Sequence, residues 1–142
     1  METKTLVLDA SVGVKWFSAR AESFLDQAID IREAHLSNRL TIMVPDLFYY
    51  EVANAIVHKK FFQPEIVQNA ISALYSLDLQ NTLMDRDLMH HSIEIARQNS
   101  LTVYDACYMA LAQRFSAPLV TANPKHLGQA LGCEVIPVEK WQ

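Results

Sequence analysis

Short apolar runs alternate with longer amphipathic segments along the whole chain. The run TLVLD at residues 5–9 is short, branched and apolar, which is typical of a buried strand. Residues 19–39 have the spacing of an amphipathic helix, with Phe24, Ala28 and Ile31 on one stripe. These two patterns predict strands at 5–9, 40–44, 79–82, 117–122 and 133–138, and helices at 19–39, 46–60, 64–77, 86–98, 104–115 and 124–130.

Alternation of strands and helices from end to end predicts an α/β fold with a mainly parallel sheet. We see no repeat, low-complexity tract or linker, so we expect residues 1–142 to form one domain. Only 3 of the 142 residues are glycine, and their spacing fits neither a P-loop nor a G-x-G-x-x-G turn. Nucleotide binding by either device is therefore excluded, and the scarcity of turn residues argues against an all-β sandwich.

The charge and cysteine content bound the protein's environment. The chain has 16 acidic residues against 12 Lys and Arg, a net charge of −4, which does not favour sequence-independent nucleic-acid binding. A local basic rim remains compatible with that total. Cys107 and Cys133 form no C-x-x-C pair, which indicates a reducing compartment. With no signal-like N-terminus and no uncharged apolar run near the ~20 residues of a membrane span, we expect a cytoplasmic protein without membrane association.

Two polar residues lie where strands of the predicted sheet end. Asp9 ends the first strand and Asn123 follows the run APLVTA. Ligands of parallel α/β sheets bind outside the carboxyl ends of the strands, so both positions are candidate site residues. Each also has a structural interpretation. Asp9 fits a helix N-cap, a role that Ser11 can share, and Asn123 before Pro124 is typical of a helix start.

Two further carboxylates lie in largely apolar helical segments. Glu51, within DLFYYEVANAIV, points into an apolar stripe, and Glu is rarely buried without a partner. An ion pair or a half-exposed position is the alternative for Glu51. Asp105 opens the apolar segment YDACYMALAQRF, where the helix dipole stabilises an anion. That dipole would also keep the carboxylate ionised in a dry site, so the structural and functional interpretations of Asp105 are compatible.

Taken together, these acids predict a cation site. Carboxylates that converge in a low-dielectric pocket repel one another and become protonated unless a cation neutralises them. Hard oxygen ligands without Cys or His suit Mg²⁺ or Mn²⁺. The sequence therefore favours a divalent-metal pocket.

Four segments in this order resemble the PIN-domain family, especially the VapC-like ribonucleases of prokaryotic toxin–antitoxin pairs. They are TLVLDASVGVKWF, VPDLFYYEVANAI, TVYDACYMALAQRF and PLVTANPKHL, and the similarity covers nearly the whole chain. The resemblance implies a PIN-like three-layer α/β/α sandwich with a mainly parallel five-stranded sheet and acids around Mg²⁺ or Mn²⁺. Asp9, Glu51 and Asp105 match the first three family acids, and Ser11 matches a hydroxyl or amide position that often supports the first.

One position departs from the family pattern. The last family acid normally follows the threonine of a T-x-D motif, and here that stretch is Thr121-Ala122-Asn123. Asn123 keeps an oxygen ligand and drops one negative charge. At ~4 Å and an effective dielectric near 20, one charge–charge interaction is up to about 4 kcal/mol before desolvation. A first metal held by Asp9 and Asp105 survives this loss, whereas a second metal is weakened, and weak or absent activity is compatible with the sequence.

The resemblance implies metal-dependent hydrolysis of RNA. In it Asp9 and Asp105 are the principal metal ligands, and Glu51 ligates directly or through water or orients the nucleophile. Asn123 is an outer or weakened ligand. Ser11 and Thr121 support the ligands or contact phosphate.

RNA binding requires cations, and five lie near the motifs. The candidates are Lys15, Arg20, Lys59, Lys60 and Lys125. Lys59-Lys60-Phe61-Phe62 also combines charge with rings that can stack on bases, although lysines at a helix end and packed phenylalanines are the plainer interpretation. Trp16-Phe17 could likewise stack on RNA bases, and packing in the core or at an interface is again the favoured interpretation. His90-His91 lack metal-ligand spacing, because helical neighbours point about 100° apart.

A second hypothesis is a PIN-like binding module that has lost turnover, which Asn123 and the acidic charge both favour. The resemblance also implies a homodimer and a small antitoxin protein that inserts a segment at the acidic cleft. A phosphoacceptor receiver domain is disfavoured, because such domains carry an acidic pair after the first strand and Asp9 is followed by Ala10 and Ser11.

Overall fold

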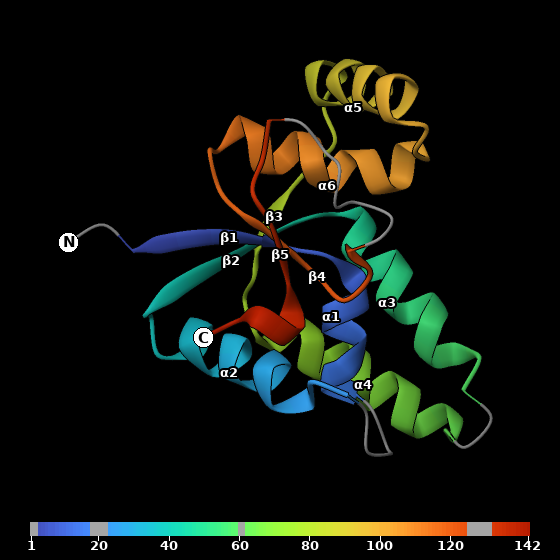
Figure 1. The fold of residues 1–142 in the computed structure, drawn as a ribbon. Coiled ribbons are helices and arrows are strands. Elements are labelled where there is room, and N and C mark those ends of the chain that lie inside the picture. The colour runs from blue at the N-terminus through green and yellow to red at the C-terminus, as the bar shows by residue number, and fades with distance from the viewer. Residues whose placement is uncertain (1–2, 18–22, 60–61, 125–131) are drawn as a thin grey trace.

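In the computed structural model, which describes residues 3–17, 23–59, 62–124 and 132–142, five strands form one sheet (Figure 1). The strand order is β3-β2-β1-β4-β5, and every pairing between these neighbours is parallel. The α/β fold with a parallel five-stranded sheet is therefore confirmed. The strands are β1 (Lys4–Leu8), β2 (Leu40–Pro45), β3 (Gln80–Thr82), β4 (Leu119–Thr121) and β5 (Val135–Pro137).

Helices cover both faces of the sheet and make it the middle of three layers (Figure 1). On one face α6 (Val103–Arg114) packs against β1, β2 and β4, and α5 (Arg86–Asn99) packs on the outer side of α6. The other face carries α1 (Ala10–Gly13), α2 (Leu25–Leu36), α3 (Leu47–Val57) and α4 (Pro64–Ser76). No helix in the described ranges is both long and apolar enough to cross a membrane.

The core lies between the sheet and these helices. All seven consecutive residues Ala106–Ala112 of α6 are buried, because this helix is enclosed by the sheet on one side and by α5 on the other. The strand β1 is equally enclosed at Leu6, Val7 and Leu8. Two side chains cap the starts of α5 and α6. Asp85 accepts a hydrogen bond from the Leu88 amide in α5, and Thr102 accepts one from the Asp105 amide in α6.

Several boundaries differ from the sequence prediction. The helix expected at 19–39 runs over Leu25–Leu36, and Phe24 before it has a φ of 61°, which no helical residue adopts. The short helices α1 and Val14–Phe17 (η1) follow β1 directly and were not predicted, because four residues are too few to show a period. The sheet ends in β5, and Val138–Lys140 (η2) follows it. The helix expected at 124–130 lies almost wholly outside the described residues.

Candidate active site

Asp9 and Thr121 lie side by side at the carboxyl edge of the sheet. The strands β1 and β4 are parallel neighbours, with Leu8 opposite Val120, so the residues that follow this pair leave the sheet together. The Asp9 amide donates to the Val120 carbonyl at 3.0 Å and fixes this register at the strand ends. The topology therefore positions two side chains that are far apart in sequence at one point of the sheet edge.

The Asp9 carboxylate is buried and is held by two hydroxyl groups. Asp9 is 8% exposed, and its Oδ2 accepts from Ser11 Oγ at 2.5 Å and from Thr121 Oγ1 at 3.0 Å. The Ser11 hydroxyl oxygen in turn accepts a hydrogen bond from the Ala122 amide, and the Thr121 hydroxyl oxygen accepts one from the Asn123 amide, both at 3.0 Å. These amides leave the hydroxyl protons free to point at Asp9. Asp9 stands at the N-cap position of α1, as the structural interpretation predicts, although its side chain makes no cap hydrogen bond there.

Burial raises the pKa of Asp9, because the charged form loses its hydration. The hydrogen bonds from Ser11 and Thr121 lower this pKa, and the charge of Asp105 raises it, and the net direction is upward. The hydrogen bonds around Asp9 therefore offset only part of the cost of burying its charge.

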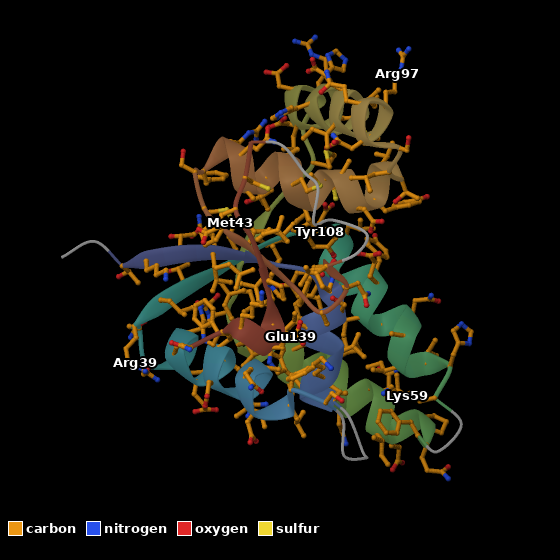
Figure 2. The ribbon with its side chains drawn as sticks, in the orientation of Figure 1. Arg39, Met43, Lys59, Arg97, Tyr108 and Glu139 are labelled. Carbon is orange, nitrogen blue, oxygen red and sulfur yellow. The ribbon has the colours of Figure 1, made fainter. Side chains whose placement is uncertain are left out.

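Glu51 is held by a residue that the sequence analysis missed. Glu51 lies half-buried on α3, and its Oε1 accepts a hydrogen bond from the Tyr108 hydroxyl at 2.6 Å. Figure 2 shows Tyr108 on α6 facing the interior, where its side chain is completely buried. Burial raises the pKa of Glu51, the Tyr108 hydrogen bond lowers it, and the charges of Asp9 and Asp105 raise it. The net pKa shift of Glu51 is upward.

Asp105 occupies the first turn of α6, as expected. Its backbone amide donates to Thr102 Oγ1 at 3.1 Å, so Thr102 caps the helix and the Asp105 carboxylate is left for other interactions. Its charge acts on both Asp9 and Glu51. The dipole interpretation and the functional one therefore coexist at Asp105.

The structure brings the three predicted carboxylates into one electrostatic neighbourhood, because the charge of Asp105 acts on Asp9 and the charges of Asp9 and Asp105 act on Glu51. Within the described ranges, no three His, Cys, Asp or Glu side chains are grouped closely enough to hold a metal ion as they stand. The donor chemistry, carboxylate oxygens of Asp9 and Glu51 with raised pKa values beside the charge of Asp105, suits a hard divalent cation. The chemical type of these ligands therefore suits a divalent cation, although the carboxylates are not gathered into a ligand cluster.

A family model for the PIN domain matches residues 6–128, which include Asp9, Glu51, Asp105 and Thr121. The chain belongs to the PIN domain family. Comparison with curated protein sequences gives no match.

Solved structures share this PIN fold at low sequence identity. A toxin–antitoxin complex from Klebsiella pneumoniae is 19% identical with a TM-score of 0.69, over 94% of this chain and 97% of that chain. A DNA-bound VapBC from Salmonella typhimurium is 14% identical with a TM-score of 0.73, over 96% and 99%. The sarcin–ricin loop cleaving toxin VapC20 from Mycobacterium tuberculosis is 14% identical with a TM-score of 0.62, over 80% and 86%.

Asn123 lies at the rim of this PIN domain site. It is exposed, and its backbone amide bonds to the Thr121 hydroxyl that supports Asp9. No hydrogen bond of its side chain is seen to any described residue, so the amide oxygen is available at the surface. Its predicted role as a weak metal ligand stays a prediction.

The predicted RNA-binding cations divide into three groups. Lys15 is 8% exposed and its Nζ donates to the Ser23 carbonyl at 2.8 Å, which contradicts a role in contacting RNA at the surface. Lys59 follows α3, with Nζ 5.8 Å from the Phe62 ring centroid, and lies at the far end of that helix from the site (Figure 2). Arg20, Lys60 and Lys125 lie outside the described residues.

The remaining sequence candidates are structural. Trp16 is buried, donates from Nε1 to the Ala28 carbonyl at 2.7 Å and packs near Phe48, which confirms packing over base stacking. His90 is exposed on α5 and His91 is half-buried there. Burial, chiefly, raises the pKa of Cys107 to about 12, which disfavours its thiolate form.

Proposed function

We propose that this PIN domain is a Mg²⁺- or Mn²⁺-dependent ribonuclease that hydrolyses RNA phosphodiester bonds. Family membership supports a nuclease, and one similar structure is a toxin that cleaves the sarcin–ricin loop. The observation that carries the proposal is the buried Asp9 carboxylate, fixed by two hydroxyls at the carboxyl edge of the sheet and facing the charge of Asp105. A buried anion kept near a like charge is strained until a cation arrives.

The residues have distinct parts in this reaction. Asp9 and Asp105 would hold the cation, and Glu51 would ligate it directly or through water, or orient the nucleophile. When bound, the cation supplies charge for the phosphate oxygens and an acidified water as nucleophile. Ser11 and Thr121 keep Asp9 oriented, since both hydroxyl protons point at one carboxylate oxygen. Tyr108 does the same for Glu51.

We further propose that the protein is the toxin of a toxin–antitoxin pair, acting in the cytoplasm as a homodimer and inhibited by a small antitoxin protein. The similar structures from Klebsiella pneumoniae and Salmonella typhimurium are complexes of this kind. Binding of the natural chain to the product of an adjacent short reading frame, with loss of cleavage, is the expected result.

Cleavage of a labelled RNA by protein stripped of metal with EDTA and then titrated with Mn²⁺ tests the enzymatic proposal. Asp9→Asn and Asp105→Asn should each lower the rate about 100-fold or more, because both remove a cation ligand. Asp30→Asn, which changes an exposed carboxylate on α2, is the matched control and should keep the full rate. Full activity in Asp9→Asn would overturn the assignment.

A binding module without turnover is the second candidate, favoured by Asn123 and by the ungrouped carboxylates. Asn123→Asp separates the two functions because it restores the family's fourth charge. For an enzyme, this variant should bind Mn²⁺ about tenfold more tightly and cut faster than the natural chain. A natural chain that neither binds Mn²⁺ nor cuts, beside an Asn123→Asp variant that does both, identifies the binding module.

A further inference from the structure

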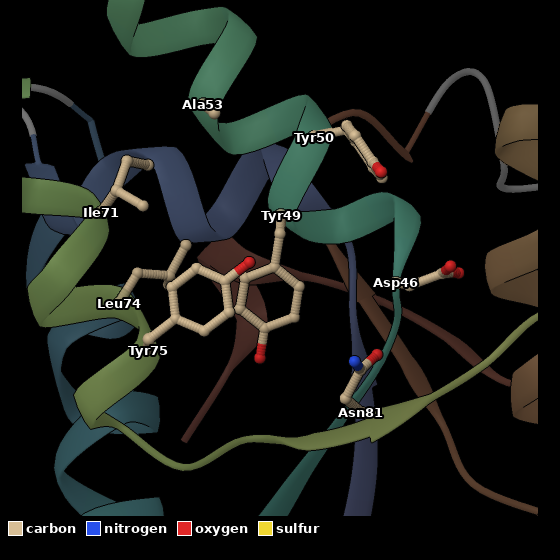
Figure 3. A pocket seen from close by; sticks show the side chains of 8 residues that line it. All are labelled: Asp46, Tyr49, Tyr50, Ala53, Ile71, Leu74, Tyr75 and Asn81. Carbon is tan, nitrogen blue, oxygen red and sulfur yellow. The ribbon is translucent and has the colours of Figure 1, made fainter. Parts of the chain in front are cut away.

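A pocket opens between α3, α4 and the ends of β2 and β3 (Figure 3). Its volume is about 370 Å³, within the ~300–1,000 Å³ that is typical of small-molecule sites. Three tyrosine rings and two uncommitted polar side chains dominate its wall. The lining residues are Asp46, Tyr49, Tyr50, Ala53, Ile71, Leu74, Tyr75 and Asn81.

Two of the tyrosines form a stacked platform. The rings of Tyr49 and Tyr75 lie nearly parallel, at 14°, with their centroids 4.6 Å apart (Figure 3). Tyr75 is 62% exposed, so one face of this pair is open to the pocket side and to solvent. Tyr50, 74% exposed, adds a third ring. An open aromatic face next to a fixed partner ring is suited to a further planar ring, because the stack is already ordered.

Three polar groups of the pocket have no hydrogen-bond partner in the part of the chain that the structure describes. Among the described residues, neither the Asp46 carboxylate, the Asn81 amide nor the Tyr75 hydroxyl makes a hydrogen bond. A carboxylate accepts only, whereas an amide both donates and accepts. Asp46 and Asn81 therefore make part of the pocket wall polar, whereas the tyrosine rings offer aromatic faces.

The pocket is adjacent to the catalytic carboxylates. Asp46 follows β2 directly, and β2 is the parallel neighbour of β1, after which Asp9 follows. Tyr50 immediately precedes Glu51 on α3. Asp46 and Glu51 both raise the pKa of the same Cys107 thiol, so the two acids lie around one point of α6.

We propose that this pocket binds one unpaired base of the RNA substrate, stacked on Tyr75. The inference rests on the ribonuclease function proposed above and adds where the substrate is held. Stacking on an aromatic ring is open to every base, because each base has a π-face. The acidic wall disfavours a phosphate in the pocket, which leaves the ring of the base as the matching part of the nucleotide.

Binding of fluorescein-labelled single-stranded A8, C8 and U8 RNA, measured by anisotropy in EDTA at fixed salt, tests the base site without cleavage. The natural chain should bind all three RNAs, because stacking accepts every base. Tyr75→Ala should weaken binding of A8 about 5- to 150-fold, the equivalent of ~1–3 kcal/mol of stacking per base. Tyr75→Phe should keep the affinity, because the ring face remains.

Tyr104→Ala is the matched control, since Tyr104 is also a 62% exposed tyrosine and does not line this pocket. It should leave all three affinities unchanged. Equal affinity of Tyr75→Ala and the natural chain for A8 would overturn the proposal. So would a natural dimer that Tyr75→Ala converts to monomers while A8 affinity is kept, because the pocket would then be a protein interface. Unaltered metal-dependent cleavage alongside either result would leave the ribonuclease proposal standing.

Discussion

Burying the Asp9 carboxylate costs the folded chain free energy at neutral pH. The pKa of Asp9 is raised above the ordinary value of 3.8, so its folded form binds a proton more tightly than the unfolded chain does. Stability from this group is therefore greatest below pH 3.8, falls as pH rises through the folded pKa, and stays low above it. A group that burdens the fold at its working pH is typical of a functional site.

Asp9→Asn should accordingly raise the melting temperature of the metal-free protein at pH 7. The amide oxygen still accepts from Ser11 and Thr121, while the buried charge is gone. The advantage over the natural chain should shrink as pH falls through the folded pKa of Asp9 towards 3.8. Thermal unfolding of both proteins in EDTA from pH 4 to 8 measures this. A variant less stable than the natural chain at pH 7 contradicts the prediction.

The hydrogen bond from the Tyr108 hydroxyl favours the ionised form of Glu51. Tyr108→Phe should raise the pKa of Glu51 further, because the hydrogen bond that lowers it is lost. The fold should lose about 1 kcal/mol, the usual net contribution of one hydrogen bond whose acceptor water can still reach. Carbon-13 NMR titration of the Glu51 carboxyl group in metal-free protein gives the pKa, with Tyr104→Phe as control. An unchanged Glu51 pKa in Tyr108→Phe would refute this role.

Sequence reasoning reached the carboxylates and missed their partners for a physical reason. Asp9 was identifiable because it ends an apolar strand, where parallel sheets present ligands. Tyr108 looked like one more apolar position of α6, since nothing in helical periodicity says which residue of another helix it will meet. Lys15 was mistaken for a surface cation, because burial of a long side chain depends on the turn at Ser23 that its ammonium contacts.

At the scale of elements, α1 packs closely against α3 at Gly13, the only glycine in α1. A Cβ on Gly13 would lie 2.5 Å from Phe48 Cζ and 3.4 Å from a Val52 methyl group, and Phe48 is completely buried. Gly13→Ala should therefore destabilise the protein by about 1–3 kcal/mol, as overpacking does. Urea unfolding of Gly13→Ala, Phe48→Leu and the double variant measures it. The double variant should lose less than the sum of the single losses. Additive losses would show that the two residues do not press on each other.

Element boundaries were predicted best where a capping residue coincides with the hydrophobic period. Helix α4 begins at Pro64 and α5 directly after the Asp85 cap, both as expected. The helix predicted at 19–39 instead begins at Leu25, because Phe24, which fits the apolar stripe, adopts a positive φ and is 43% exposed. Apolar spacing alone therefore does not locate the first residue of a helix.

For the whole molecule, the topology follows from the alternation of elements, whereas the site's distances do not. Parallel strands must send their carboxyl ends to one edge, so the convergence of Asp9 and Thr121 was foreseeable. The Tyr49–Tyr75 platform was not, because it depends on how α3 and α4 rotate against each other when they pack. The same holds for the spacing of the three carboxylates, which side-chain packing sets.

Cation binding should be visible in the stability of the whole molecule, independent of turnover. A ligand at 100 times its Kd stabilises the folded state by about 2.7 kcal/mol, a rise of roughly 5–15 °C in Tm for a domain of this size. Mn²⁺ should produce that rise in the natural chain and in Asp30→Asn, and none in Asp9→Asn, whose cation ligand is missing. Asn123→Asp should reach the same rise at a lower Mn²⁺ concentration. Differential scanning fluorimetry across a Mn²⁺ series measures all four proteins, and equal shifts in Asp9→Asn and the natural chain would mean that the cation binds elsewhere.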